Sequence, residues 1–151
     1  MLRNDTVAGP LTISAGTIST SSATNTGSFT SGGLAFGAGA TSIRMKVGTG
    51  ADLITGGAVT TAGTATFNLT QQGGALVVGN TYPLINYTGA TPGLGGFALG
   101  ALPGHLVGSL VDVSGAIALS VTANDKVVWD ASIDGNWNIN RSEERRVGRR
   151  V

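Results

Sequence analysis

The chain has 151 residues, a length that suits one domain, with 25 glycines, 11% charged residues and no cysteine. The lack of cysteine excludes disulfides and thiolate metal sites, and no apolar run reaches the roughly 18 residues of a membrane helix. The net charge of +1 is uneven, because residues 1–140 have four basic and six acidic side chains whereas residues 141–151 have five arginines and two glutamates. This acidic balance over residues 1–140 argues against a nucleic-acid partner.

The composition predicts an all-β protein. Glycine exceeds twice its usual share of about 7%, and charged residues fall well below the usual share of about 25%. Disordered chains are normally charged and poor in β-branched residues, whereas this chain is rich in Thr, Val and Ile. We therefore expect short strands joined by frequent tight turns.

Residues 1–33 carry the weakest signal. Ile13 and Ile18 each stand between hydroxyl side chains, and Gly16 separates the two triplets. Such alternation suits narrow strands with one buried face. The sequence leaves two interpretations open for this part, light Ser/Thr/Gly-rich coils or a disordered lead-in.

From residue 34 to residue 122 the strand signal is stronger. Apolar residues alternate with polar ones around Phe36, Met45 and Phe67, and residues 79–89 combine both tyrosines with Leu84 and Ile85. The segments recur at roughly even spacing, and Asp-Gly or Asn-Gly hairpin turns are almost absent. We therefore predict a β-solenoid of stacked coils, with an antiparallel β-sandwich as the alternative.

The end of this unit predicts a closing hairpin. Residues 106–113 and 116–121 are apolar strands separated by Ser114 and Gly115. Such a hairpin would cover the exposed edge of the last coil. Residues 123–140 are predicted to be a linker and the start of a following module.

Several segments resemble the autotransporter-associated β-strand repeat proteins, a family of bacterial surface proteins. The stretch from Asp52 to Gly56 resembles the family's "D-L-hydrophobic … G" coil, and residues 79–89 resemble its "G-x-x-Y-x-L-I-x-Y-x-G" coil. Further resemblances lie in residues 64–70, Phe97, Leu102-Pro103, residues 116–121, and the "W-D … G-N-W" pattern from Trp129 to Trp137.

This resemblance implies a right-handed parallel β-helix of the passenger type. It also implies a structural segment, a stalk or adhesin-like spacer, in a secreted or surface-anchored bacterial protein on the outer membrane exterior. The expected partners are neighbouring repeats of the same long chain. We expect no catalysis, no cofactor, no nucleic acid and no membrane insertion by this segment.

Residues 141–151 resemble the in-frame translation of a short-read sequencing adapter. We interpret them as a non-native tail. The rival interpretation is a basic arm for nucleic acid or anionic lipid.

No constellation of residues predicts catalysis or a metal site. His105 is the only histidine and follows Pro103-Gly104 in an expected loop, and Asp52 precedes a strand, where a turn role is expected. The remaining acidic or amide candidates are too scattered for acid/base work, and their spacing does not fit a calcium loop; they are Asp112, Asp125, Asp130, Asp134 and Asn136.

Trp129 and Trp137 are the candidate glycan contacts. Exposed aromatic rings can stack on sugars, although paired tryptophans more often fill a small core. They support an alternative function, a polysaccharide-binding module that contacts surface glycans.

Overall fold

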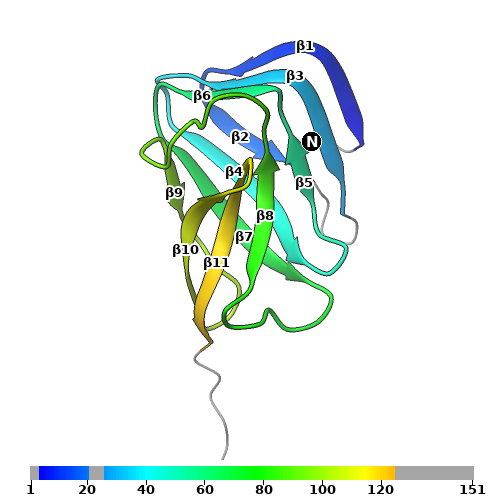
Figure 1. Cartoon of the computed structure of the whole chain (residues 1–151), viewed down its shortest axis with the longest axis vertical. Helices are drawn as coiled ribbons and strands as arrows, with labels where there is room; N and C mark the ends of the chain where they lie inside the picture. The colour runs from blue at the N-terminus through cyan, green and yellow to red at the C-terminus, as the bar shows by residue number, and fades with distance from the viewer. Residues whose placement is uncertain (1–3, 21–25, 125–151) are drawn as a thin grey trace, which may run out of the picture.

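The chain folds into two β-sheets that enclose one apolar core (Figure 1). The computed structural model describes residues 4–20 and 26–124, and within these ranges every regular element is a strand. The all-β class predicted from the composition is therefore confirmed.

Strands of the two sheets interleave along the chain. The first sheet has the order β1-β3-β5-β8-β11-β10, with β6 also beside β3, and the second has the order β2-β4-β7-β9. The first sheet contains β1 (Asp5–Ile13), β3 (Ser28–Phe36), β5 (Leu53–Thr55), β6 (Ala58–Thr61), β8 (Thr81–Asn86), β10 (Leu106–Val113) and β11 (Ala116–Asn124). The second contains β2 (Gly16–Ser19), β4 (Thr41–Gly48), β7 (Ala65–Gln72) and β9 (Phe97–Leu99).

Neighbouring strands from β1 to β9 pair in parallel, and up to β7 they do so at a nearly constant offset along the chain. Thr41 of β4 pairs with Gly16 of β2 and with Ala65 of β7. The sequence separations of these two pairs differ by only one residue. The first sheet keeps nearly the same offset between β1, β3, β5 and β6. The next step is longer in both sheets, because Ile54 pairs with Ile85 and Ala65 pairs with Phe97.

The alternative prediction of an antiparallel sandwich is wrong for these strands. Consecutive strands such as β3 and β4 lie in different sheets, so the turns between them carry the chain across the core. A strand therefore finds its partner in the same sheet one repeat away, and that partner runs in the same direction. Within the described residues, antiparallel pairing occurs only among β8, β11 and β10.

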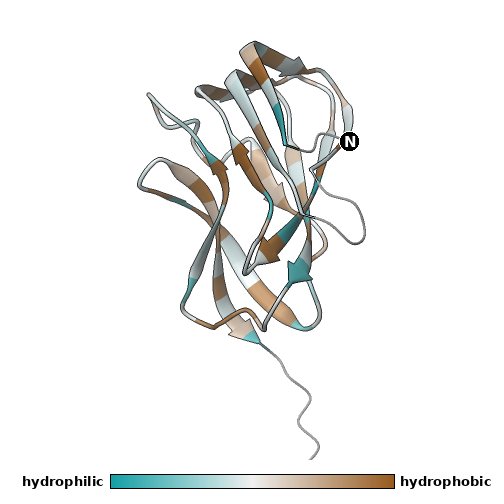
Figure 2. Ribbon diagram, turned by 90° about the vertical axis from the view of Figure 1, so that its right-hand side faces the viewer, coloured by the Kyte–Doolittle hydropathy of each residue, from teal (hydrophilic) through white to brown (hydrophobic). Residues whose placement is uncertain are grey.

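Parallel register places apolar residues in continuous columns inside the molecule. One column crosses the first sheet through Phe29, Ile54, Ile85 and Ile117, all at most 2% exposed. A matching column in the second sheet runs through Ile18, Ile43 and Phe67. The ring of Phe97 lies 5.9 Å from that of Phe67 and 5.8 Å from that of Phe36 in the first sheet. Figure 2 shows brown apolar residues alternating with paler and teal ones along the strands.

Glycine is required where backbones of successive repeats approach closely. A Cβ on Gly57 would lie 1.9 Å from the carbonyl oxygen of Gly32, and a Cβ on Gly32 would lie 2.4 Å from that of Ala8. These three positions stack at the break between β5 and β6. A side chain at Gly32 or Gly57 would therefore force the neighbouring strands apart.

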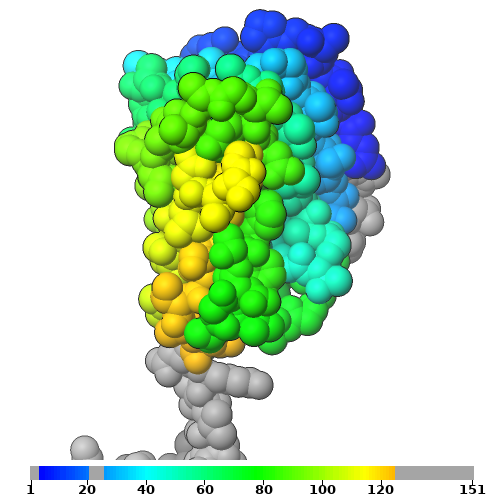
Figure 3. Space-filling model, in the orientation of Figure 1, coloured from blue at the N-terminus to red at the C-terminus, as the bar shows by residue number. Residues whose placement is uncertain are grey.

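The predicted closing hairpin is confirmed as β10 and β11. Ser114 and Gly115 both have positive φ, at 51° and 82°, as a two-residue type I′ turn requires. The hairpin does not lie across the last repeat. Instead β11 pairs with β8 and extends the first sheet, so β10 becomes its outer edge. Figure 3 shows the yellow and orange surface of the hairpin beside the green surface around β8.

Two predicted boundaries need correction. The boundary after residue 33 falls inside β3, because Gly33 and Leu34 both pair with β1 and with β6. The predicted linker begins at Ala123, but Ala123 and Asn124 pair with β10 as the end of β11. The predicted following module from residue 125 onward and the tail at residues 141–151 lie outside the described residues.

Truncating Ile85 should destabilise the fold strongly. Its side chain is fully buried between Ile54 and Ile117, so Ile85→Ala should lower the free energy of unfolding by about 2–5 kcal/mol. Thr30→Ala, on the exposed face of β3, should cost less than about 1 kcal/mol. Urea unfolding compares the two variants, and equal losses would contradict the column of buried residues.

Candidate functional site

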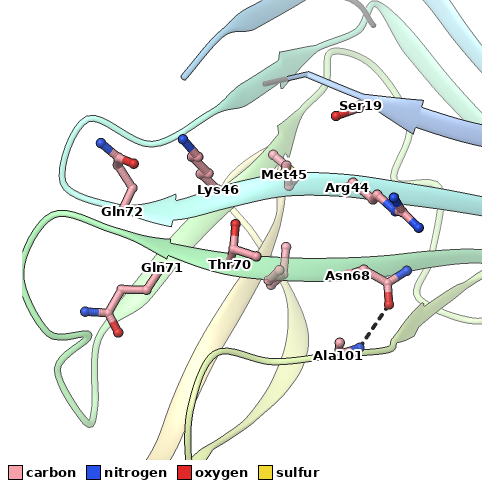
Figure 4. Close-up of a pocket in the computed structure, with 10 residues that line it drawn as sticks. Ser19, Arg44, Met45, Lys46, Asn68, Thr70, Gln71, Gln72 and Ala101 are labelled. Carbon is pink, nitrogen blue, oxygen red and sulfur yellow. Dashed lines mark hydrogen bonds between the residues drawn. The ribbon is translucent and has the colours of Figure 1, made fainter. Parts of the chain in front are cut away.

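A groove of about 590 Å³ lies on the outer face of the second sheet (Figure 4). Its walls come mainly from β4 and β7, with contributions from β2 and from the segment after β9. The lining residues are Ser19, Arg44, Met45, Lys46, Asn68, Leu69, Thr70, Gln71, Gln72 and Ala101.

Strand alternation directs the polar lining residues away from the core. Arg44 stands between the buried Ile43 and Met45, and Asn68 stands between the buried Phe67 and Leu69. Since successive side chains of a strand point to opposite faces, the polar ones reach the groove.

Parallel register then arranges these residues in rows across the sheet. Ser19 pairs with Arg44, which pairs with Asn68, and in the next row Lys46 pairs with Thr70. Residues from three repeats are therefore brought together over neighbouring strands. Figure 4 shows Arg44, Lys46, Asn68 and Thr70 on the two central strands of this face, with Ser19 on the neighbouring strand β2.

Hydrogen bonds fix the orientation of the Asn68 amide in the groove. Asn68 Nδ2 donates to Ser42 Oγ at 2.9 Å, and the backbone N–H of Ala101 donates to Asn68 Oδ1 at 3.0 Å. The Asn68 side chain therefore joins β4, β7 and the segment after β9 in one orientation.

The groove has a positive electrostatic character. Over residues 4–20 and 26–124, Arg44 and Lys46 are the only lysine or arginine residues, and both line it. None of the three carboxylates in these ranges, Asp5, Asp52 and Asp112, is among the lining residues. Arg44 is exposed, whereas Lys46 is 6% exposed and has an interaction of its own. This combination of groups favours binding of an anion.

Asp52 is a buried structural residue rather than part of the groove. Its carboxylate accepts hydrogen bonds from Thr20 Oγ1 at 2.9 Å, from the Gly27 backbone N–H at 2.7 Å and from the Lys46 backbone N–H at 2.7 Å. The Asp52 N–H in turn donates to the Lys46 carbonyl at 3.0 Å. From the turn after β4, this one side chain thus joins the end of β2, the start of β3 and β4 itself, which agrees with the predicted turn role.

A second polar cluster joins the loop after β8 to the hairpin. The carboxylate of Asp112 accepts hydrogen bonds from the hydroxyls of Tyr87 and Thr91. The hydrogen bond to Asp112 is the main reason that the pKa of Tyr87 is raised from its usual value of 10.0. Asp112 thereby ties residues 87–91 to β10.

The other predicted candidates are not brought together. His105 is exposed in the loop before β10. Within the described residues no group of three or more His, Cys, Asp or Glu side chains could hold a metal ion. Trp129, Trp137, Asp125, Asp130, Asp134 and Asn136 lie outside the described residues.

The groove is not predicted from the sequence. The alternation of Arg44 and Lys46 with apolar residues is local, but Asn68 and Thr70 come from the next repeat of the chain. Only the strand register places these four side chains on one surface. The constant offset between paired strands is the signal that could have located it.

Comparison with family models, with curated proteins and with solved structures finds no match for this chain. Among the residues that the structure describes, no helix is long and apolar enough to span a membrane.

Removing the Asp52 carboxylate should destabilise the protein more than removing one of its donors. Asp52→Ala leaves three donors without their acceptor, each costing about 1–3 kcal/mol, so the free energy of unfolding should fall by roughly 3 kcal/mol or more. Thr20→Val removes one donor and should cost about 1 kcal/mol. Urea unfolding measures both, and a loss in Asp52→Ala no larger than in Thr20→Val would contradict this role.

Proposed function

We propose that this chain is a β-solenoid segment, a right-handed parallel β-helix closed by a C-terminal hairpin. It serves as a structural stalk or adhesin-like spacer in a larger secreted or surface-anchored bacterial protein. In this role the segment has no catalytic activity. Its partners are the neighbouring repeats of the same long chain.

The nearly constant offset between parallel strands is the observation that carries the proposal. Between one strand and its partner, the chain contributes one strand level to the first sheet and one strand to the second, as with β3 and β4. A chain that returns to the same position after each such stretch builds stacked coils. Each coil then buries its apolar face only against its neighbours, as in repeat proteins.

The two ends of the array differ in a way that fits this role. The N-terminal end presents β1 and β2, which among the described residues have parallel partners on one side only. The C-terminal end has the antiparallel hairpin, which is unlike the repeats. Terminal units of repeat arrays are atypical in this way.

The segments that resemble the autotransporter-associated repeat family fall on equivalent positions. The stretch from Asp52 leads into β5, and residues 79–89 contain β8, which pairs with β5 in parallel. The proposed location on the bacterial cell surface rests on this resemblance alone.

The alternative role for Trp129 and Trp137 as glycan contacts stays a prediction, because both residues lie outside the described ranges.

Duplicating one repeat tests the solenoid directly. A second copy of residues 41–64, inserted after Thr64, begins where β7 would begin and contains one strand for the second sheet and one row for the first. We expect the copy to add a coil, so its strand amides should be protected in hydrogen exchange and the free energy of unfolding should rise.

A scrambled copy of the same segment is the matched control. It should loop out, leave its amides unprotected and leave the free energy of unfolding unchanged or lower. If the native copy also loops out with unprotected amides, the solenoid proposal fails.

A further inference from the structure

We propose that the groove over β4 and β7 binds an anionic oligosaccharide, with a sugar carboxylate held by Arg44. This inference goes beyond the structural role, and it stands whether or not the segment serves as a stalk.

The positive charge of the lining residues indicates a negatively charged ligand. Both cationic side chains in the described residues line this groove, while Asp5, Asp52 and Asp112 do not. The guanidinium of Arg44 is exposed, and no ion pair of its side chain occurs among the described residues. A planar guanidinium binds a carboxylate through two parallel hydrogen bonds, which gives both affinity and direction.

The remaining lining groups identify a ligand rich in hydroxyls. Beside Arg44 lies the Asn68 amide, and farther along the groove lie the Thr70 hydroxyl and then the amides of Gln71 and Gln72 (Figure 4). Amides and hydroxyls both donate and accept hydrogen bonds, as sugar hydroxyls require. The volume of about 590 Å³ is within the range of small-molecule sites.

The amide of Asn68 is already oriented for binding. Its hydrogen bonds with Ser42 and Ala101 use one N–H and one lone pair, which leaves one donor and one acceptor position. Because the side chain is held before a ligand arrives, little conformational entropy is lost on binding. Lys46 is largely buried and adds positive charge to the lining of the groove.

A nucleic acid fits this surface less well. Binding a phosphate backbone takes several cationic contacts, whereas the groove has two cationic residues and no aromatic residue for base stacking. A uronate needs one strong carboxylate contact and several neutral hydrogen bonds, which is the set that the lining residues offer.

The test is a calorimetric titration of the full chain with tetragalacturonate and with its fully methyl-esterified form. The ester keeps the sugar hydroxyls and removes the charge. We expect the charged form to bind, with affinity that falls as salt rises, and the ester to bind at least tenfold more weakly.

Three variants locate the contact. Arg44→Gln should weaken tetragalacturonate binding roughly tenfold or more, and Arg44→Lys should retain part of the affinity, because the charge stays while the planar fork is lost. Changing all five arginines of residues 141–151 to glutamine should leave binding unchanged. Because Arg44 is exposed, urea unfolding of Arg44→Gln should match the unaltered chain.

Three results would overturn the proposal. One is the absence of tetragalacturonate binding, and another is equal binding of the acid and the ester. The third is unchanged binding by Arg44→Gln together with loss of binding in the tail variant, which would move the contact to residues 141–151.

Discussion

Parallel pairing at a nearly constant chain offset is the constraint on which the rest of this structure depends. From β1 to β5 each connection carries the chain from one sheet to the other, so consecutive strands there do not pair with each other. Each of these strands pairs in parallel with another strand of its own sheet. The strand register brings buried apolar residues such as Phe29, Ile54 and Ile85 to the same level. This pairing requires glycine at positions 32 and 57, because the neighbouring backbones approach Gly32 and Gly57 too closely for a Cβ. The buried carboxylate of Asp52 strengthens it, because it binds donors of two successive repeats.

The groove is a consequence of the same register. Arg44 and Asn68 are far apart in the sequence but directly paired on β4 and β7. Their side chains face outward because Ile43, Met45, Phe67 and Leu69 fill the core on the other side. Packing in the core fixes the inward-facing residues of β4 and β7, whereas their outward-facing polar residues line the groove.

The sequence predicts the strand content and the hairpin, because both depend on local patterns. Alternation around Phe67 and the pair Ser114-Gly115 each carry their information within a few residues. The prediction is less successful for strands that have few apolar residues, such as β1, in which Val7, Leu11 and Ile13 are only half-buried. The predicted boundary divides β3 for the same reason. Local patterns do not reveal the groove, since it depends on the register between strands far apart in the sequence, and the longer later step obscures their common offset.

Cross-strand nuclear Overhauser effects in the full chain test the parallel register most directly. In this arrangement Ile43 of β4 lies between Ile18 of β2 and Phe67 of β7. The account predicts cross-peaks from Ile43 to both residues, with the backbone pattern of parallel strands. Cross-peaks that instead pair β4 with β3 in an antiparallel hairpin would contradict it.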